Sequence, residues 1–147
     1  MTPFIVLVGS FLLFRALGAA GVAPLASTVV SLRCGLAVMF LLTASAHFSA
    51  RRADLVRMVP PLFPRPALLV TLTGAAEILG AAGIVLPRTA PWAAGGLALL
   101  LLALFPANIH AARERLTIGG VPVTRLVPRA ALQVAFLTAV LLAGFGR

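Results

Sequence analysis

Five long apolar runs, separated by short polar connectors, make up most of the chain. Each run is long enough to cross the hydrocarbon core of a bilayer, about 30 Å thick, as an α-helix that rises about 1.5 Å per residue. The runs do not alternate apolar and polar residues with a period of two, so they are not strands of a membrane barrel. The sequence therefore predicts five membrane-spanning helices, over residues 3–22, 28–50, 67–86, 92–112 and 130–145.

The composition agrees with this pattern. Hydrophobic residues make up 61% of the sequence and charged residues only 10%, whereas soluble domains are about 45–50% apolar. We therefore predict an all-α, multi-pass membrane bundle in a single domain. The first run has no positively charged start and contains Arg15, so we expect a retained helix; a cleaved signal peptide is the alternative.

The charges predict an orientation. The chain has twelve arginines and three acids, with a net charge of +9, and most of the arginines fall in two connectors, residues 51–66 and 113–129. Both connectors lie on one side of a five-span bundle, and the positive-inside rule places that side in the cytoplasm. We expect a cytoplasmic N-terminus and an outside C-terminus, in the inner (plasma) membrane of a bacterium, because arginine without lysine is typical of GC-rich coding. The expected partner is the lipid bilayer and not nucleic acid, which needs a basic patch on a soluble face.

Glu77 is the only acidic residue within any of the five runs. Burying a carboxylate in lipid costs on the order of a few kcal/mol, so Glu77 needs a partner and is a candidate site residue. By helical rise, Arg15 lies about 18 Å and Glu77 about 15 Å from the cytoplasmic face, and the long side chain of Arg33 reaches inward from outside. We predict an ion pair of Glu77 with Arg33, Arg15 or both. A purely structural pair, a proton or ligand site, and a neutral Glu77 all stay open.

A second set of polar residues lies at the cytoplasmic ends of the predicted helices. The set consists of His47, Asn108, His110, Arg113 and Gln133. Pro106 frees a backbone carbonyl one turn earlier and commonly kinks a membrane helix. Such a cluster can hold an anionic or carbonyl-bearing headgroup, for example a quinone ring. The alternative is that these residues only meet the membrane interface.

Metal and thiol chemistry find little support. The two histidines lie on different helices, without CxxCH or HExxH spacing or a Cys/His cluster, so we predict no bound metal. Cys34 is the only cysteine, which excludes an internal disulfide and dithiol chemistry. We find no nucleophile–base pair and expect that the chain is not an enzyme by itself.

Several short motifs follow one another between Leu32 and His110. They are Leu32-Arg33, Ala46-His47-Phe48, Arg57-Met58-Val59-Pro60-Pro61, Pro64-Arg65-Pro66, Thr73-Gly74 with Glu77-Ile78-Leu79-Gly80, Leu86-Pro87-Arg88 and Phe105-Pro106-Ala107-Asn108-Ile109-His110. Together they resemble the DoxX family of small bacterial membrane proteins. The resemblance implies a four-helix core from runs two to five, with the first run as an added N-terminal helix. Arg33, His47, Glu77 and Asn108 match recurrent polar positions of that family, whereas Ser45 stands where the family often has glycine.

The family is named for a subunit similar to part of a terminal quinol oxidase or thiosulfate–quinone oxidoreductase complex. The resemblance therefore implies a non-catalytic subunit or scaffold of a quinone-linked redox complex, with other subunits of that complex as partners and a quinone as candidate cofactor. The alternative is a small-molecule or proton pathway that uses Glu77. A cavity that reaches Glu77 would favour the pathway, and a closed, dry ion pair would favour the scaffold.

Overall fold

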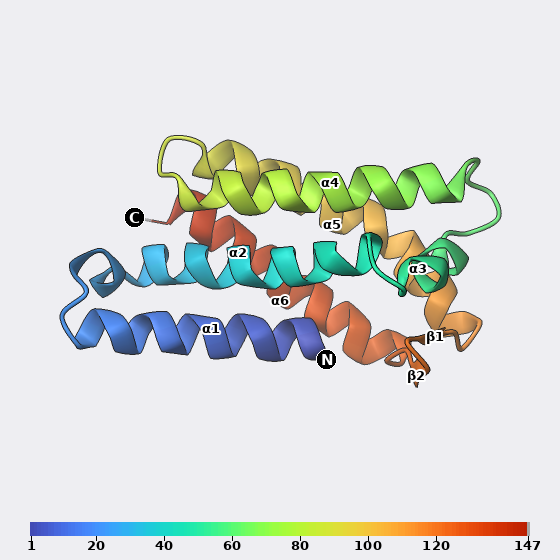
Figure 1. The fold of residues 1–147 in the computed structure, drawn as a ribbon, viewed down its shortest axis with the longest axis horizontal. Coiled ribbons are helices and arrows are strands. Elements are labelled where there is room, and N and C mark those ends of the chain that lie inside the picture. Colours follow the sequence, from blue (N-terminus) through green and yellow to red (C-terminus); the bar gives the residue numbers. More distant parts are fainter. Residues whose placement is uncertain (147) are drawn as a thin grey trace.

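The computed structural model describes residues 1–146 and forms a bundle of five long helices (Figure 1). These helices are α1 (Thr2–Ala19), α2 (Thr28–His47), α4 (Pro66–Val85), α5 (Ala90–Arg113) and α6 (Leu126–Phe145). All five are long and apolar enough to cross a membrane. The prediction of an all-α, multi-pass membrane bundle is confirmed, and each helix begins and ends within four residues of its predicted span.

Short elements join the long helices. The 3-10 helix η1 (Ala23–Ala26) connects α1 to α2, and α3 (Arg52–Met58) follows α2. The strands β1 (Thr117–Ile118) and β2 (Val121–Pro122) pair antiparallel between α5 and α6. Gly119 and Gly120 between them have φ of 58° and 78°, as the tightest hairpin turn requires. Helix α3 and the hairpin lie at the same end of the bundle, and the C-terminus lies at the other (Figure 1). We call the end with α3 and the hairpin the basic end, because most of the arginines belong to its connectors and helix ends.

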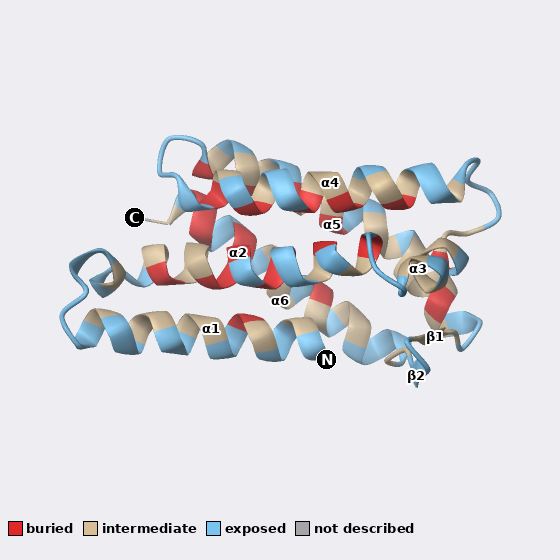
Figure 2. Ribbon diagram, in the orientation of Figure 1, coloured by how far each residue is buried: buried red, intermediate tan, exposed pale blue. Residues whose placement is uncertain are grey.

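Four of the helices form a closed core. Helix α2 packs against α4 and α6, and α5 packs against the same two helices, while α1 lies along the outside of α2. Most of the buried residues, red in Figure 2, belong to these four helices. Helix α1 buries only Leu7. The largest fully buried side chains include Leu36, Ile84 and Leu97. A four-helix core with an added N-terminal helix is the predicted arrangement.

Small residues set the closest helix contacts. A Cβ atom at Gly35 on α2 would lie 3.2 Å from the backbone nitrogen of Phe11 on α1. A Cβ atom at Gly83 on α4 would lie 2.9 Å from Cβ of Ala93 on α5. In lipid, where no hydrophobic force drives helices together, such close packing is a main source of association. Small residues therefore fix both the α1–α2 and the α4–α5 contacts.

Candidate functional site

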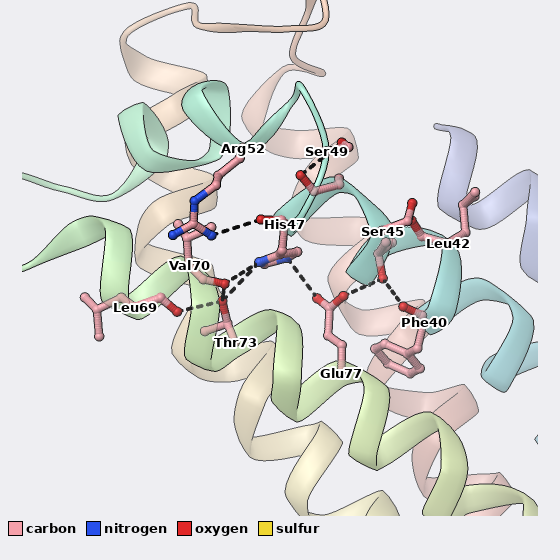
Figure 3. A network of polar contacts seen from close by, with 12 residues as sticks. Phe40, Leu42, Ser45, His47, Ser49, Arg52, Leu69, Val70, Thr73 and Glu77 are labelled. Atoms are coloured by element: carbon pink, nitrogen blue, oxygen red, sulfur yellow. Dashed lines mark hydrogen bonds and ion pairs between the residues drawn. The ribbon is translucent and has the colours of Figure 1, made fainter.

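Glu77 is buried inside the bundle, and its partner is a histidine. Its Oε1 lies 3.6 Å from Nε2 of His47 (Figure 3). Its Oε2 accepts a hydrogen bond of 2.8 Å from the hydroxyl of Thr43. Thr43 and His47 lie four residues apart on α2, so both side chains face the same point on α4. The predicted ion pair of Glu77 with Arg33 or Arg15 is wrong.

The two arginines instead bind backbone carbonyls toward the other end of the bundle. Arg15 donates to the carbonyls of Leu25 at 3.2 Å and Ala26 at 2.6 Å, at the end of η1. Arg33 donates from Nε to the carbonyl of Ala143 at 2.8 Å, in the last turn of α6. Helix C-termini leave carbonyls without intrahelical partners and carry partial negative charge, and a guanidinium satisfies both. Each arginine therefore holds neighbouring helices together through the backbone.

The hydrogen bonds of His47 fix its tautomer. Nδ1 lies 2.7 Å from the carbonyl oxygen of Val70 (Figure 3), and a carbonyl can only accept, so Nδ1 carries a hydrogen. In the neutral ring Nε2 then has a free lone pair that points at Glu77. The distance of 3.6 Å between Nε2 and Oε1 is that of an ion pair and is too long for a hydrogen bond. We call His47 and Glu77 together the acid–base pair.

Gly74 makes room for the imidazole ring. It lies on α4 three residues before Glu77, on nearly the same face. A Cβ atom at Gly74 would lie 2.6 Å from Cβ and 2.8 Å from Cγ of His47. Because these atoms are close to the α2 backbone, they cannot move aside cheaply. The absent side chain of Gly74 therefore sets how closely α2 and α4 approach at the acid–base pair.

Arg52 holds the end of α2 against the first turns of α4. Its guanidinium donates to the carbonyl of His47 at 3.0 Å (Figure 3). It also donates to the carbonyl of Ala67 at 2.9 Å and to the hydroxyl of Thr71 at 2.8 Å. The first of these bonds satisfies a carbonyl that α2 leaves open at its C-terminus, and the other two reach the first turns of α4. From the sequence, Arg52 is only one of the charges of a connector, because a set of backbone and hydroxyl acceptors leaves no pattern in the sequence.

A cavity of about 630 Å³ at the basic end reaches the acid–base pair. This volume lies in the range of small-molecule sites, about 300–1,000 Å³. Residues from all five long helices, α3 and the hairpin line it, and most of the lining is leucine, valine, proline and alanine. Its charged and titratable side chains are Arg51, His47, Glu77 and Arg129. The cavity thus combines an apolar wall with a few polar groups.

The structure divides the set of five polar residues that the sequence predicts at one end of the helices. His47 and Asn108 line the cavity together with Glu77, and His110, Arg113 and Gln133 are outside its lining. Gln133 is buried and donates to the carbonyl of Leu101 at 2.5 Å, which ties α6 to α5 beside Pro106. Arg113 is exposed at the end of α5.

Arg129 joins the site although the sequence analysis assigned it to a connector. Its Nη1 donates to Oδ1 of Asn108 at 2.5 Å. Helix α6 begins at Leu126, four residues earlier than predicted, because Pro128 falls in the first turn, where its missing N–H has no intrahelical partner to lose. The earlier start places Arg129 on α6 and next to α5.

The comparisons with known proteins give a family. The family model described as "Domain of unknown function (DUF8561)" matches residues 36–144. No curated protein and no solved structure matches the chain. The matched segment contains His47, Glu77, Asn108 and Arg129 and leaves out α1. Because the match covers about three quarters of the sequence, the chain belongs to the DUF8561 family.

Proposed function

We propose that this membrane protein binds a small lipid-soluble molecule in the cavity at the basic end, and that the acid–base pair contacts it and exchanges a proton. One observation carries the proposal: the cavity of about 630 Å³ includes both Glu77 and His47 in its lining. A pair that served only to hold α2 on α4 would need no open space beside it. The open space favours the small-molecule or proton pathway over a purely structural role.

The chemistry of the lining supports the same choice. Ligand sites are mostly apolar, with a few polar groups that orient the ligand, and ionisable residues inside a membrane mark ligand or proton paths. Imidazole and carboxyl groups both take up and release protons, so the acid–base pair can donate a hydrogen bond to a ligand carbonyl or accept one from a ligand hydroxyl. The proton exchanges with the molecule or with water that enters the cavity.

A second candidate function is a non-catalytic subunit of a quinone-linked membrane redox complex. The motifs that resemble the DoxX family support it, together with the position of His47, Glu77 and Asn108 around one cavity. A quinone has carbonyl oxygens that these side chains can bind. In this case the partners of the protein would be the other subunits of the complex. Both candidates use the same cavity, so the identity of the bound molecule separates them.

The proposed orientation follows the charges. The basic end carries the two arginine-rich connectors, and the positive-inside rule places it in the cytoplasm of a bacterium, at the inner membrane. The N-terminus then lies inside and the C-terminus outside. Cysteine labelling of residues 57 and 88 from outside intact cells tests this: only position 88 is expected to react.

Analysis of bound molecules tests the function. The chain is purified in a mild, uncharged detergent, and lipid-soluble molecules that accompany it are extracted and identified by mass spectrometry. We expect Glu77→Gln and His47→Gln to lose the bound molecule. Glu114→Gln and His110→Gln are matched controls, because both residues lie outside the cavity lining, and they should retain it.

Two results would contradict the proposal. One is that neither the purified chain nor the chain emptied and incubated with membrane extract holds any molecule in a Glu77-dependent way. The other is that Thr43→Val, which removes a hydrogen bond to Glu77 but no charge, retains all binding while Glu77→Gln fails to fold. The second result would assign the acid–base pair to structure alone.

A further inference from the structure

Arg129 is a half-buried guanidinium that faces the cavity with little to neutralise it. Its Nη1 donates to Asn108. Its Nε is buried and has no hydrogen-bond acceptor within residues 1–146. Among the Asp and Glu carboxylates of the same residues, the ion pairs that form join Glu77 to His47 and Asp54 to Arg57, and neither includes Arg129.

The surroundings of Arg129 differ from those of Arg52, which holds the end of α2 against α4. A guanidinium carries five N–H donors and keeps its charge, and removing it from water costs several kcal/mol unless it is paired. Arg52 meets this need with three protein acceptors. Arg129 has a neutral amide oxygen as its protein acceptor, so part of its donor fork is available to a ligand.

The charged side chains that line the cavity are mainly positive. Two arginines, Arg51 and Arg129, line it together with a single acid, Glu77, which lies 3.6 Å from His47. The side chains of the lining are therefore net positive whether the pair holds one proton or none. A fixed positive charge in a partly apolar cavity favours an anion.

The shape of the cavity adds an apolar requirement. Arg129 lies near the start of α6 at the basic end, and Leu42 and Leu104 line the cavity at least one turn deeper in the bundle than His47 and Asn108. We infer that the ligand is an amphiphile with an anionic oxygen group, a carboxylate or a phosphate, and that Arg129 with Asn108 binds this group while the apolar chain lies along the leucines. The inference rests on the proposed function, because it names the class of molecule that the cavity takes.

A set of four probes tests the inference on the full chain in uncharged detergent. The probes are a long-chain fatty acid, the alkyl phosphate and the methyl ester of the same chain length, and inorganic phosphate. Affinity is measured by displacement of a fluorescent fatty acid. Because a charge-assisted hydrogen bond contributes about 1.5–3 kcal/mol, we expect the two anionic amphiphiles to bind at least about tenfold more tightly than the ester. Inorganic phosphate alone should bind far more weakly than the alkyl phosphate.

Variants assign the preference to Arg129. Arg129→Gln should abolish the difference between acid and ester, and Arg129→Lys should retain part of it, since lysine keeps the charge but not the fork. Arg125→Gln is the matched control, because Arg125 is exposed just before α6 and lies outside the lining, and it should leave the difference unchanged. If Arg129→Gln does not fold, the salt dependence of the unmodified chain decides, because salt should weaken acid binding and not ester binding.

The outcomes separate the two proposals. Equal affinity for acid and ester in the unmodified chain, or a preference that survives in Arg129→Gln, overturns the inference. If the ester still binds in a Glu77-dependent way, the proposed function stands without it. If none of the amphiphiles binds, the inference fails, and the proposed function is then decided by the analysis of the molecules that accompany the purified chain. Phosphate that binds as tightly as the alkyl phosphate also overturns the inference, because the apolar chain would then contribute nothing.

Discussion

Nε2 of His47 lies 3.6 Å from Oε1 of Glu77, across the interface between α2 and α4. The two residues are thirty positions apart in the sequence, and each is the partner that the other needs at this depth. Val70 and Thr43 complete the set by binding the far side of the ring and the second carboxylate oxygen. A titratable pair is thereby held in the apolar part of the bundle next to open space.

A double-mutant cycle measures the energy of this contact. Glu77→Gln and His47→Gln should each destabilise the fold by about 1–3 kcal/mol, because each leaves a buried partner unsatisfied. The double variant should cost less than the sum, with a coupling of about 1–2 kcal/mol. Unfolding of the detergent-solubilised chain, followed by circular dichroism, gives the three values.

The same cycle with Arg33 tests the alternative pairing. Arg33→Met should cost about 1 kcal/mol through loss of the bond to the Ala143 carbonyl. Combined with Glu77→Gln, the effects should add within about 0.5 kcal/mol, since the two side chains do not share a contact. A coupling as large as that of His47 would show that the arginine pairs with the acid after all.

Gly74→Ala should destabilise the bundle by about 1–3 kcal/mol, because the new methyl group would overlap the root of the His47 side chain. The control is Gly96→Ala on α5, where a Cβ atom would have no neighbour within 4 Å. That substitution should be neutral or stabilise by up to about 1 kcal/mol, since alanine is the better helix former. Thermal unfolding in detergent compares the two. Equal melting temperatures would mean that α2 and α4 separate easily at this point.

The hairpin should detach from α3 at acidic pH. Oδ2 of Asp54 accepts from the backbone N–H of Gly119 at 2.7 Å, and this bond, helped by Arg57, lowers the pKa of Asp54. A carboxylate whose pKa is lower in the folded than in the unfolded state stabilises the fold at a pH above its unfolded pKa. This stabilisation is lost as the pH falls through the pKa of the folded state, which for Asp54 lies below the ordinary aspartate value of about 4. The amide resonance of Gly119 should therefore titrate in that range, and in Asp54→Ala it should be displaced at every pH. Glu114→Gln should leave it unchanged.

Arg52→Gln should loosen the end of α2. The substitution removes donors to the His47 carbonyl and to Thr71, and we expect a loss of about 1–3 kcal/mol in the free energy of unfolding. Hydrogen exchange of the last turn of α2 should become faster while that of α6 does not change. Arg57→Gln on α3 is the control, because its ion pair with Asp54 is exposed. A similar effect in both variants would indicate that charge, and not the contacts of Arg52, is responsible.

The helices and the burial of Glu77 could be predicted because both depend on local sequence. An apolar run long enough to cross a bilayer becomes a helix whatever surrounds it. The partner of Glu77 could not be predicted in this way, because it depends on the offset between α2 and α4. Helix α2 ends at His47 and not at residue 50, and its last residue lies beside Val70, one turn inside α4. This offset brings His47 to the level of Glu77.

The contacts of three arginines could not be predicted from the sequence either. Arg15 and Arg33 bind backbone carbonyls, and carbonyls are present at every position, so no sequence pattern distinguishes these acceptors. Arg129 was missed for a different reason. Whether a polar residue at the edge of an apolar run belongs to the helix or to the connector depends on the residue at which the helix begins. Helix ends are the part of a structure that a sequence predicts least well.

Because Nδ1 of His47 is bonded to the carbonyl of Val70, only Nε2 of the ring is left to exchange a proton. A histidine with two free nitrogens can work as a relay that takes up a proton on one side and releases it on the other. Here Nδ1 is already bonded to a backbone carbonyl of α4, so it is not available for such a relay. A proton that Nε2 receives is therefore released again from Nε2, so His47 can exchange a proton with a molecule in the cavity, whereas the imidazole ring does not pass one from one nitrogen to the other.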